Sequence, residues 1–323
     1  DAAGNASEQA VTVGVTNVDE VAPTISSSAT GTALENQNLL YTASSTDATD
    51  YVAGATSYSL KTGGDAALLS INASTGAVTL SSGNLNYEGK TSYTFTVVAT
   101  DAAGNASEQA VTVGVTNVAP TISSGSTGSV TEGATAGTTV YTAAATDPAG
   151  GTVTYSLTGT DASAFTINSS TGAVTINATP NFETKSSYSF NVVASDGSLT
   201  STKAVTVGVT NVAPTFSSGG TASVAENATT AYTAAASDTA GGTVTYSLGG
   251  TDAGKFTINA TTGVVSFVSG PSFEAPSDSG GNNVYDITVT ASDGSATTTQ
   301  AVAITVTNVA PTISSGSTGS VTE

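Results

Sequence analysis

Five residue types are absent from the 323-residue sequence, namely cysteine, methionine, tryptophan, histidine and arginine. Without thiols, imidazoles or guanidinium groups, the chain cannot build a Ser-His-Asp triad, a Cys-His pair, a histidine or cysteine zinc site, or an arginine clamp for phosphate. The absence of cysteine also excludes disulfides. We therefore expect no enzyme, and we expect rigidity to come from another source, for which a divalent metal is a candidate.

Positive charge is scarce, because five lysines stand against 24 acidic residues and the net charge is −19. No basic patch is available to release counterions from a phosphate backbone, so we expect no nucleic-acid binding. The sequence contains no run of 18 or more apolar residues and no basic, apolar leader at its N-terminus. We expect no membrane span in this segment, and a signal or anchor elsewhere in the parent protein stays open.

Only 9% of the residues are charged, while Thr, Ser, Ala, Gly and Asn are abundant, which would be compatible with disorder. Regular alternation of β-branched and aromatic residues argues against it. In Ser92–Ala99, for example, Tyr93, Phe95 and Val97 fall on one face at a period of two. That face is the predicted core face of a β-strand.

A short motif, Thr-Asn-Val-Ala-Pro-Thr, occurs at 116–121, 210–215 and 307–312, and a longer version occupies 16–24. Each copy follows a valine-alternating run, and a residue before proline favours extended backbone, so the motif predicts a strand that runs into an extended joint. Successive joint prolines are 97, 94 and 97 residues apart. A period of about 95 residues exceeds that of solenoid repeats and lies within the size range of independent domains.

The joints divide the chain into tandem domains. We predict a C-terminal fragment of a preceding repeat at 1–18, complete repeats at 19–117, 118–211 and 212–308, and an N-terminal fragment of a following repeat at 309–323. The two fragments are copies, because Asp1–Val18 is identical to Asp101–Val118 and Val309–Glu323 is identical to Val118–Glu132. Val11, Val13 and Val15 are expected on one face of the last strand of the preceding repeat.

The second repeat shows the strand pattern most clearly. Its expected strands are Ser129–Glu132, Thr139–Ala145, Thr152–Leu157, Ala164–Ile167, Ala173–Ile176, Ser187–Ala194 and Ala204–Val209. Seven short strands separated by turn signals, without helical periodicity, predict an all-β fold of tandem Greek-key, immunoglobulin-like, seven-stranded β-sandwiches in a linear array.

Turn residues recur at matching positions in the repeats. Gly76, Gly172 and Gly263 each close an Asn-x-x-Thr-Gly turn, where a hairpin loop needs positive φ. An Asp-Ala pair recurs in each repeat, and its aspartate is expected to cap the adjacent turn; these aspartates are Asp65, Asp161 and Asp252. The Asn-x-Ser/Thr triplets reflect composition rather than glycosylation.

Acidic residues also recur at fixed positions of the repeat, in four sets. The sets are Glu35, Glu132, Glu226 and Glu323 after the first strand; Glu88, Glu183 and Glu274 after an aromatic residue; Asp47, Asp147 and Asp238 at a strand end; and Asp1, Asp101, Asp196 and Asp293 at the end of the Tyr/Phe-alternating strand. Strand ends of a sandwich gather at its two poles, so these sets can meet only at domain junctions. Clustered carboxylates repel unless a cation lies among them, and oxygen ligands select calcium over transition metals. The alternative is that solvated acids keep the β surface soluble.

The ordered motifs resemble those of a cadherin repeat. They are Glu132, then Thr146–Leu157, Asn181-Phe182-Glu183, Tyr188–Gly197 and Val207–Pro214. In particular, the chain is similar to the cadherin-like repeats of very large bacterial surface adhesins, including those of the RTX type. The similarity covers the three complete repeats and both fragments. It implies calcium ions bound between domains, with glutamates from the earlier repeat, the linker, and aspartates from the later repeat.

Carried onto this sequence, the resemblance implies a ligand set at each joint. The sets are Asn17, Asp19 and Glu20 with Asp47 and Asp101 at the N-terminal joint; Glu35, Glu88 and Asn117 with Asp147 and Asp196 at the first complete joint; Glu132, Glu183 and Asn211 with Asp238 and Asp293 at the second; and Glu226, Glu274 and Asn308 at the C-terminal joint.

The sequence also departs from the family pattern. The family has Asp two residues before the aromatic-linked glutamate, whereas this chain has Asn86, Asn181 and Ser272. After Asp147 and Asp238, this chain has Ala149 and Ala240 where the family has a second Asp. The short linkers of this chain also lack the acidic residues of the family's linkers. Fewer charges imply fewer or weaker ions, with dissociation constants in the extracellular range of about 10⁻⁴ to 10⁻³ M. The joint with Asp19 and Glu20 is expected to bind calcium best.

These features predict a calcium-stiffened extender segment of a bacterial cell-surface adhesin, which holds distal domains away from the cell and has neighbouring repeats as its partners. The alternative is a repeat that itself binds a partner, whether another copy, a carbohydrate or a surface, through loops such as 276–283, which the other repeats lack. That loop can equally be a tolerated insertion. Ice binding by rows of threonine side chains is a third hypothesis. A glycosidase pair is disfavoured because the acids recur in every repeat.

Overall fold

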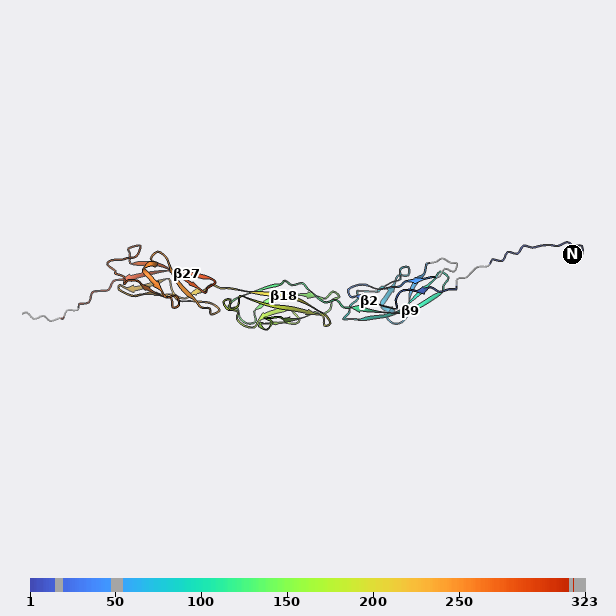
Figure 1. The fold of residues 1–323 in the computed structure, drawn as a ribbon, viewed down its shortest axis with the longest axis horizontal. Coiled ribbons are helices and arrows are strands. Elements are labelled where there is room, and N and C mark those ends of the chain that lie inside the picture. The colour runs from blue at the N-terminus through green and yellow to red at the C-terminus, as the bar shows by residue number, and fades with distance from the viewer. Residues whose placement is uncertain (15–19, 48–54, 314–315, 317–323) are drawn as a thin grey trace, which may run out of the picture. The chain divides into compact units, whose positions relative to one another are not determined.

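The computed structural model describes residues 1–14, 20–47, 55–313 and 316 (Figure 1). The chain divides into two compact units. The first consists of Asp1–Ser123, Ala144–Thr154 and Ala194–Ser201, and the second consists of Ser124–Ala143, Tyr155–Val193 and Thr202–Glu323. The boundary runs through the second repeat, so the turns that carry Asp147 and Asp196 belong to the same unit as the first sandwich. Among the described residues, no helix is long and apolar enough to span a membrane.

The first repeat forms a four-stranded and a three-stranded sheet with a shared core, and a separate two-stranded pair. Its elements are β1 (Thr24–Ile25), β2 (Thr30–Leu34), β3 (Leu39–Thr42), β4 (Ser45–Thr46), β5 (Ser57–Lys61), the 3₁₀ turn η1 (Ala66–Leu68), β6 (Leu69–Ile71), β7 (Ala77–Leu80), β8 (Ser92–Thr100) and β9 (Ala106–Thr116). A four-stranded sheet has the order β2-β9-β8-β5, a three-stranded sheet has the order β3-β7-β6, and β1 pairs with β4. The β2–β9 pair is parallel, whereas β5–β8 and β8–β9 are antiparallel.

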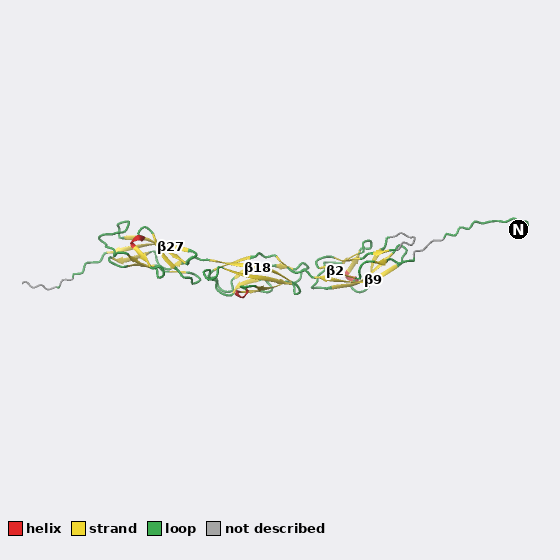
Figure 2. Cartoon of the chain, viewed as in Figure 1, coloured by secondary structure: helices red, strands yellow, loops and turns green. Residues whose placement is uncertain are grey.

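The second and third repeats follow the same plan (Figure 2). The second contains β10 (Thr121–Ile122), β11 (Thr127–Thr131), β12 (Thr139–Thr142), β13 (Ala145–Thr146), β14 (Thr154–Thr158), η2 (Ala162–Ala164), β15 (Phe165–Ile167), β16 (Ala173–Ile176), β17 (Ser187–Ser195) and β18 (Thr200–Thr210). The third contains β19 (Thr215–Phe216), β20 (Thr221–Ala225), β21 (Thr230–Thr233), β22 (Ala236–Ser237), β23 (Thr245–Gly249), η3 (Ala253–Lys255), β24 (Phe256–Ile258), β25 (Val264–Phe267), β26 (Val284–Ser292) and β27 (Thr297–Thr307).

The predicted all-β sandwich is confirmed. In the fully described second repeat, β10 with β11 and β12 with β13 are the halves of two interrupted strands, which brings the total to seven strands. The sequence pattern predicted a continuous strand over Thr139–Ala145. In the structure, β12 pairs with β16 in one sheet and β13 pairs with β10 in another, with a register shift between Thr139 and Tyr141. The strand breaks because it changes sheets, as strands at sandwich corners do.

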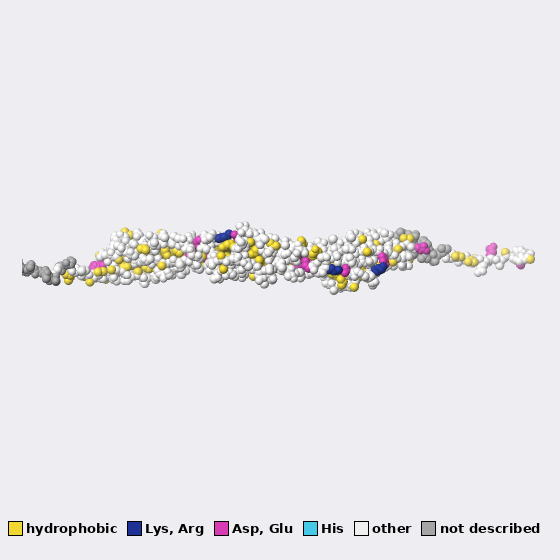
Figure 3. All heavy atoms as spheres, turned by 90° about the horizontal axis from the view of Figure 1, so that it is seen from below, with side chains coloured by type: hydrophobic (Ala, Val, Ile, Leu, Met, Phe, Trp, Pro, Cys, Tyr) yellow, Lys and Arg dark blue, Asp and Glu magenta, His cyan; other side chains and the backbone are white. Residues whose placement is uncertain are grey.

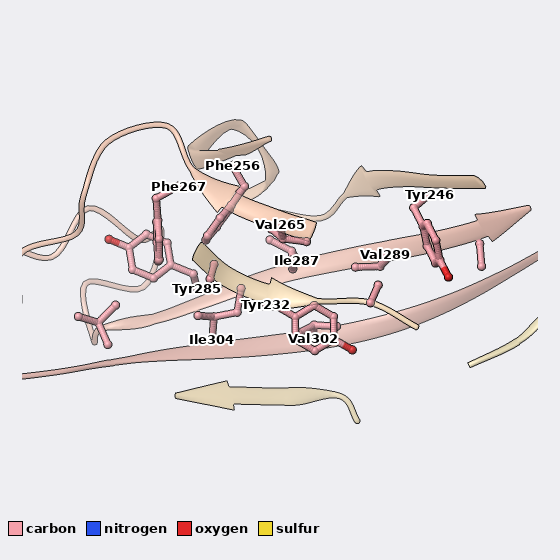
Figure 4. Close-up of a cluster of buried hydrophobic side chains, with 14 residues drawn as sticks. Tyr232, Tyr246, Phe256, Val265, Phe267, Tyr285, Ile287, Val289, Val302 and Ile304 are labelled. Atoms are coloured by element: carbon pink, nitrogen blue, oxygen red, sulfur yellow. The ribbon is translucent and has the colours of Figure 1, made fainter. Parts of the chain in front are cut away.

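Alternating residues form the core, as predicted. Tyr93, Phe95 and Val97 on β8 are 6%, 3% and 0% exposed. In the third repeat, the rings of Phe256 and Phe267 lie 4.5 Å apart between centroids and pack beside other buried aromatic and aliphatic side chains (Figure 4). Full burial of each large apolar side chain stabilises the fold by about 1.5–3 kcal/mol.

The three predicted turn glycines are confirmed. Gly76, Gly172 and Gly263 have φ of 68°, 72° and 67°. A Cβ at any of these glycines would lie 2.3 Å from a backbone carbonyl oxygen of the neighbouring strand segment. Only glycine therefore fits these turns without a shift of the backbone.

The prediction that aspartates cap the adjacent 3₁₀ turns was wrong. Asp65, Asp161 and Asp252 precede η1, η2 and η3, and none makes a side-chain capping bond. Each carboxylate instead accepts a backbone N–H from an adjacent strand or strand start at 2.8 Å; the donors are Thr94, Ser189 and Asp286 respectively. The aspartate fastens the turn to the sheet, a contact between segments about 30 residues apart.

Residues 1–14 do not form the strand expected there. Val11 and Val13 are 76% and 77% exposed, whereas their sequence counterparts Val111 and Val113 on β9 are buried. Val15 lies outside the described residues. A strand needs a hydrogen-bonded neighbour, and the matching residues on β9 are flanked by β2 and β8.

The 276–283 insertion folds back onto its own repeat. Its Asp278 is 7% exposed and accepts the backbone N–H groups of Asn282 and Asn283 at 3.0 and 3.1 Å. The backbone N–H of Ser279 donates to Asp252 at 2.8 Å. In the first two repeats, a lysine ammonium occupies the corresponding position; the pairs are Lys90–Asp65 and Lys185–Asp161. The insertion therefore supplies the partner that the absent lysine provides elsewhere.

Candidate metal centre

A buried glutamate joins the end of the first repeat to its linker. Glu35 follows β2 and is 2% exposed. Its Oε1 accepts the backbone N–H of Val118 at 2.7 Å and its Oε2 accepts that of Tyr87 at 3.1 Å. The parallel pairing of β2 with β9 brings these groups together, because it places Leu34 opposite Thr116. A glutamate at this strand end thus fixes the position of the linker.

The same arrangement recurs in the next two repeats. Glu132 accepts the N–H groups of Val212 and Phe182 at 2.5 and 3.0 Å. Glu226 accepts those of Val309 and Phe273 at 2.9 and 3.3 Å. Glu35, Glu132 and Glu226 therefore share one local structure, while Glu323, the fourth glutamate of the predicted set, lies outside the described residues.

The Asp147 turn presents one free carboxylate oxygen. Asp147 is 7% exposed, and its Oδ1 accepts the backbone N–H groups of Ala149 and Gly151 at 2.9 and 3.0 Å. Its Oδ2 is buried and has no hydrogen-bond partner. Asp238, 8% exposed, repeats this pattern with Ala240 and Gly242 and likewise leaves its Oδ2 without a partner.

These groups converge in two carboxylate clusters. Ligand oxygens of Glu35, Glu88 and Asp147 all lie within 4.8 Å of one another, and a second cluster is formed in the same way by Glu132, Glu183 and Asp238. Two unit charges 4 Å apart near a protein surface interact by about 4 kcal/mol. Such clusters of negative charge are unfavourable unless protons or a cation neutralise them. On the face drawn in Figure 3, acidic side chains form small, separate patches.

The electrostatics of the exposed glutamates show this repulsion. Desolvation raises the pKa of the Glu88 carboxyl above its usual value, and the negative charges of Glu35, Asp147 and Asp196 raise it further. Glu183 behaves alike: desolvation raises its pKa first, followed by the charges of its own cluster and of Asp293. Both glutamates therefore hold protons more tightly than a free side chain does.

The linker asparagine contacts the second predicted aspartate at each of the two complete joints. Asn117 Nδ2 donates to Asp196 Oδ2 at 3.3 Å, and Asn211 Nδ2 donates to Asp293 Oδ2 at 3.4 Å. Desolvation pushes the pKa of Asp196 up, but hydrogen bonds from Leu199, Ser198 and Asn117 outweigh it and hold the pKa below its usual value. Asp196 therefore releases its proton more readily than a free side chain does, and its negative charge raises the pKa of Glu88.

The residues present fit a hard cation. The donors are all oxygens, and four buried oxygens have no hydrogen-bond partner; these are Asp147 Oδ2, Asn117 Oδ1, Asp238 Oδ2 and Asn211 Oδ1. A buried polar atom without a partner costs about 1–3 kcal/mol, which a bound cation would offset. Carboxylate and amide oxygens at one site are the ligands that calcium prefers.

The two terminal joints are less complete. Asn17 and Asp19 lie outside the described residues, and Glu20 is exposed. Asp101 uses its carboxylate to close its own turn, accepting the N–H groups of Gly104 and Asn105 at 2.7 and 2.8 Å. Within the described part of the chain, Asp47, Asp101, Glu226 and Glu274 belong to no three-carboxylate cluster. Asn308 is exposed. The prediction that the longer joint binds calcium best stays a prediction.

One polar contact of the joints was missed at the sequence level. Asn86 and Asn181 stood out only as replacements of a carboxylate. In the structure, Asn86 Nδ2 donates to the backbone carbonyl of Ala149 at 3.1 Å, and Asn181 Nδ2 donates to that of Ala240 at 3.4 Å. The recurrence of asparagine at this position in two repeats was the signal that the sequence offered. The role of that asparagine could not be inferred, because its partner lies about 60 residues further along the chain.

Comparison with known proteins shows the family. The chain matches the Cadherin domain family over residues 30–116 and 126–210. It is 36% identical over 210 residues to the Protocadherin-like wing polarity protein stan of Drosophila melanogaster, covering 56% of this chain and 6% of that protein. It is 33% identical over 166 residues to human Protocadherin Fat 4, covering 49% and 3%. The chain thus spans less than a tenth of either relative.

Solved cadherin structures also resemble the chain. Mouse Cadherin-23 EC22-24 has 22% identity and a TM-score of 0.36, with 89% of this chain and 99% of that one covered. Drosophila N-cadherin EC1-3 has 20% identity and a TM-score of 0.35, with 87% and 98% covered. Cadherin domains are extracellular, bind calcium and form a non-enzymatic family of adhesion and structure. Since the family match covers more than half of its residues, this chain of tandem β-sandwich repeats belongs to the cadherin domain family.

Proposed function

We propose that the chain is a calcium-stiffened extender segment of a large extracellular adhesin, which holds distal binding domains away from a cell surface. One observation carries the proposal: at each complete joint, two glutamates and an aspartate from consecutive repeats converge, and the aspartate keeps a buried oxygen without a partner. Glu35, Glu88 and Asp147 would hold one ion. Glu132, Glu183 and Asp238 would hold another.

Bound calcium supplies positive charge that neutralises the cluster. The chain's own groups do the rest of the work. The Val118 N–H holds Glu35 in place, and the turn amides of Ala149 and Gly151 hold Asp147. Asn117 and Asp196 stand beside the cluster and complete the proposed ligand set, as do Asn211 and Asp293 at the second joint. Ligands from consecutive repeats that share one ion would restrict the motion between those repeats.

The same proposal extends to the terminal joints and to the origin of the chain. Asn17, Asp19, Glu20, Asp47 and Asp101 are the proposed ligands of the N-terminal joint, with Glu226, Glu274 and Asn308 at the C-terminal one. A bacterial surface adhesin of the RTX type is the proposed parent protein, and the near-identical tandem units support a repetitive extender segment. Neighbouring repeats of the same chain are the proposed partners.

Calcium titration by calorimetry combined with small-angle scattering tests the proposal. The paired variant Glu35→Gln with Glu132→Gln should weaken calcium binding at both complete joints. Glu108→Gln is the matched control, because Glu108 pairs with Lys61 on the surface, away from both clusters. The wild-type protein should be more extended with calcium than with chelator. An envelope equally extended in both conditions would exclude stiffening by calcium.

A further inference from the structure

The Asn86 side chain spans the first complete joint through direct hydrogen bonds. Its Oδ1 accepts the backbone N–H of Gly89 at 2.6 Å. This bond orients the amide so that Nδ2 points toward the second repeat. Its Nδ2 then donates to the carbonyl oxygen of Ala149 at 3.1 Å. The donor belongs to the first repeat and the acceptor to the second, and both lie in the same compact unit.

The acceptor peptide lies in the turn that carries the cluster aspartate. The N–H of Ala149 donates to Asp147 Oδ1 at 2.9 Å, while its carbonyl accepts from Asn86. Asp147 Oδ1 is thereby committed to the turn, and Oδ2 is the oxygen left for the cluster with Glu35 and Glu88. Asn86 thus holds Ala149, and Ala149 in turn holds the Asp147 carboxylate so that its Oδ2 is left for the cluster.

The second joint repeats this chain of contacts. Asn181 Oδ1 accepts the N–H of Thr184 at 2.7 Å, and its Nδ2 donates to the carbonyl of Ala240 at 3.4 Å. Ala240 in turn donates its N–H to Asp238 Oδ1 at 2.8 Å, and Asp238 Oδ2 stays without a partner. In the third repeat, Ser272 takes the first of these roles, since its Oγ accepts the N–H of Ala275 at 3.2 Å.

A carboxylate could not make this contact. An ionised aspartate has only acceptor oxygens, so it cannot donate to a carbonyl. It would also add a negative charge to a joint that already gathers Glu35, Glu88 and Asp147. The Asn86 amide therefore makes a direct hydrogen bond to the Asp147 turn, which an ionised acidic side chain could not make without a bridging cation.

We propose that Asn86 and Asn181 are positioning residues, which dock the Asp147 and Asp238 turns against the glutamates before calcium arrives. The joints are then partly ordered in the metal-free protein, and less ordering remains for calcium to induce. The effect on calcium affinity rests on the proposed function. The docking of the turns in metal-free protein does not.

The test measures both properties on the full chain. Amide hydrogen exchange of Ala149, Gly151, Ala240 and Gly242 is followed by NMR in chelator, and calcium affinity is measured by calorimetry. Asn86→Ala with Asn181→Ala removes both donors. Asn86→Asp with Asn181→Asp keeps the acceptor oxygen for Gly89 and Thr184 but removes the donor. Asn177→Ala is the control, because Asn177 Nδ2 donates to Ser163 within a single repeat.

Both double variants should accelerate exchange at these turn amides by about fivefold in chelator, the change expected from losing one hydrogen bond, and the control should not. The alanine double variant should also bind calcium about fivefold more weakly. Unchanged exchange in both double variants would overturn the positioning role. If the wild-type chain does not bind calcium, the proposed function fails, and the exchange measurement still decides whether the asparagines dock the turns.

Discussion

Glu35 Oε1 accepts a hydrogen bond from the backbone N–H of Val118 at 2.7 Å, although the two residues are 83 positions apart. Glu35 directly follows β2, and Val118 lies in the linker that follows β9, the last strand of the repeat. This bond therefore closes the repeat on itself at the pole where the carboxylates gather. The joint is built on a residue that is both a structural anchor and a proposed ligand.

Replacing that anchor should weaken the repeat as well as the metal site. In Glu35→Gln, the amide offers one acceptor oxygen and one NH₂ group to two backbone N–H donors, so one donor loses its partner. We expect the free energy of unfolding of the first repeat to fall by about 1–3 kcal/mol in chelator, measured by urea denaturation. Glu108→Gln, in which an exposed ion pair is lost, should change it by less than about 1 kcal/mol. Equal stability of both variants would contradict the anchoring role.

Calcium binding should weaken as the pH falls. Desolvation and neighbouring carboxylates raise the pKa of Glu88 and Glu183, so protons compete with the cation at pH values above the usual glutamate range. Calorimetry at about pH 5 and pH 7 should show weaker binding at the lower pH, and binding at pH 5 should release protons into the buffer. Identical affinities at both values would show that these glutamates are not ligands.

The Lys185–Asp161 pair should stabilise the second repeat only above the acid range. A hydrogen bond from Lys185, followed by that from the Ser189 backbone, lowers the pKa of Asp161 below its ordinary value. A carboxyl with a depressed folded-state pKa contributes stability that is present above its unfolded pKa of about 3.9 and is lost as the pH falls through the folded value. The stability difference between wild type and Asp161→Asn should be constant from pH 7 to about pH 5 and should shrink below about pH 4. Thermal unfolding across this range measures it.

A lysine at the position of Lys90 and Lys185 in the first two repeats should be able to replace the 276–283 insertion of the third repeat. Exchanging residues 276–284 for Lys-Ser-Ser, the sequence of residues 185–187, restores an ammonium group beside Asp252. We expect the free energy of unfolding of the third repeat to change by less than about 1 kcal/mol, whereas an Ala-Ser-Ser exchange should lower it by about 1–3 kcal/mol because the buried carboxylate loses a partner. If the Lys-Ser-Ser variant loses binding to a second copy, a carbohydrate or a surface, the insertion is instead a binding loop.

Adding a methyl group at Gly172 should disrupt the second repeat. Its φ is 72°, and a Cβ would lie 2.3 Å from the carbonyl oxygen of Ala143. We expect Gly172→Ala to lower the free energy of unfolding by at least about 1–3 kcal/mol, measured by chemical denaturation. Gly219→Ala is the control, because a Cβ there meets nothing within 4 Å. Similar losses in both variants would mean that the close approach is relieved at little cost.

The sequence by itself determined the period, the β-sandwich fold and the carboxylates that converge. Alternation at Tyr93, Phe95 and Val97 is a local property of a strand with one buried face, so it can be recognised without knowledge of the partners. The resemblance of the ordered motifs to cadherin repeats then assigned Glu35, Glu88 and Asp147 to one joint, and these three side chains do lie together.

Only the tertiary structure decided what each polar group does there. Asp147 commits one oxygen to its own turn and leaves the other free, Asn86 donates across the joint, and Asp65 reaches Thr94 on the adjacent strand instead of its own turn. These roles depend on parallel pairing of β2 with β9 and on contacts between residues about 30 to 80 positions apart. A hydrogen bond is directional and short, so which donor meets which acceptor is decided only when distant segments are packed.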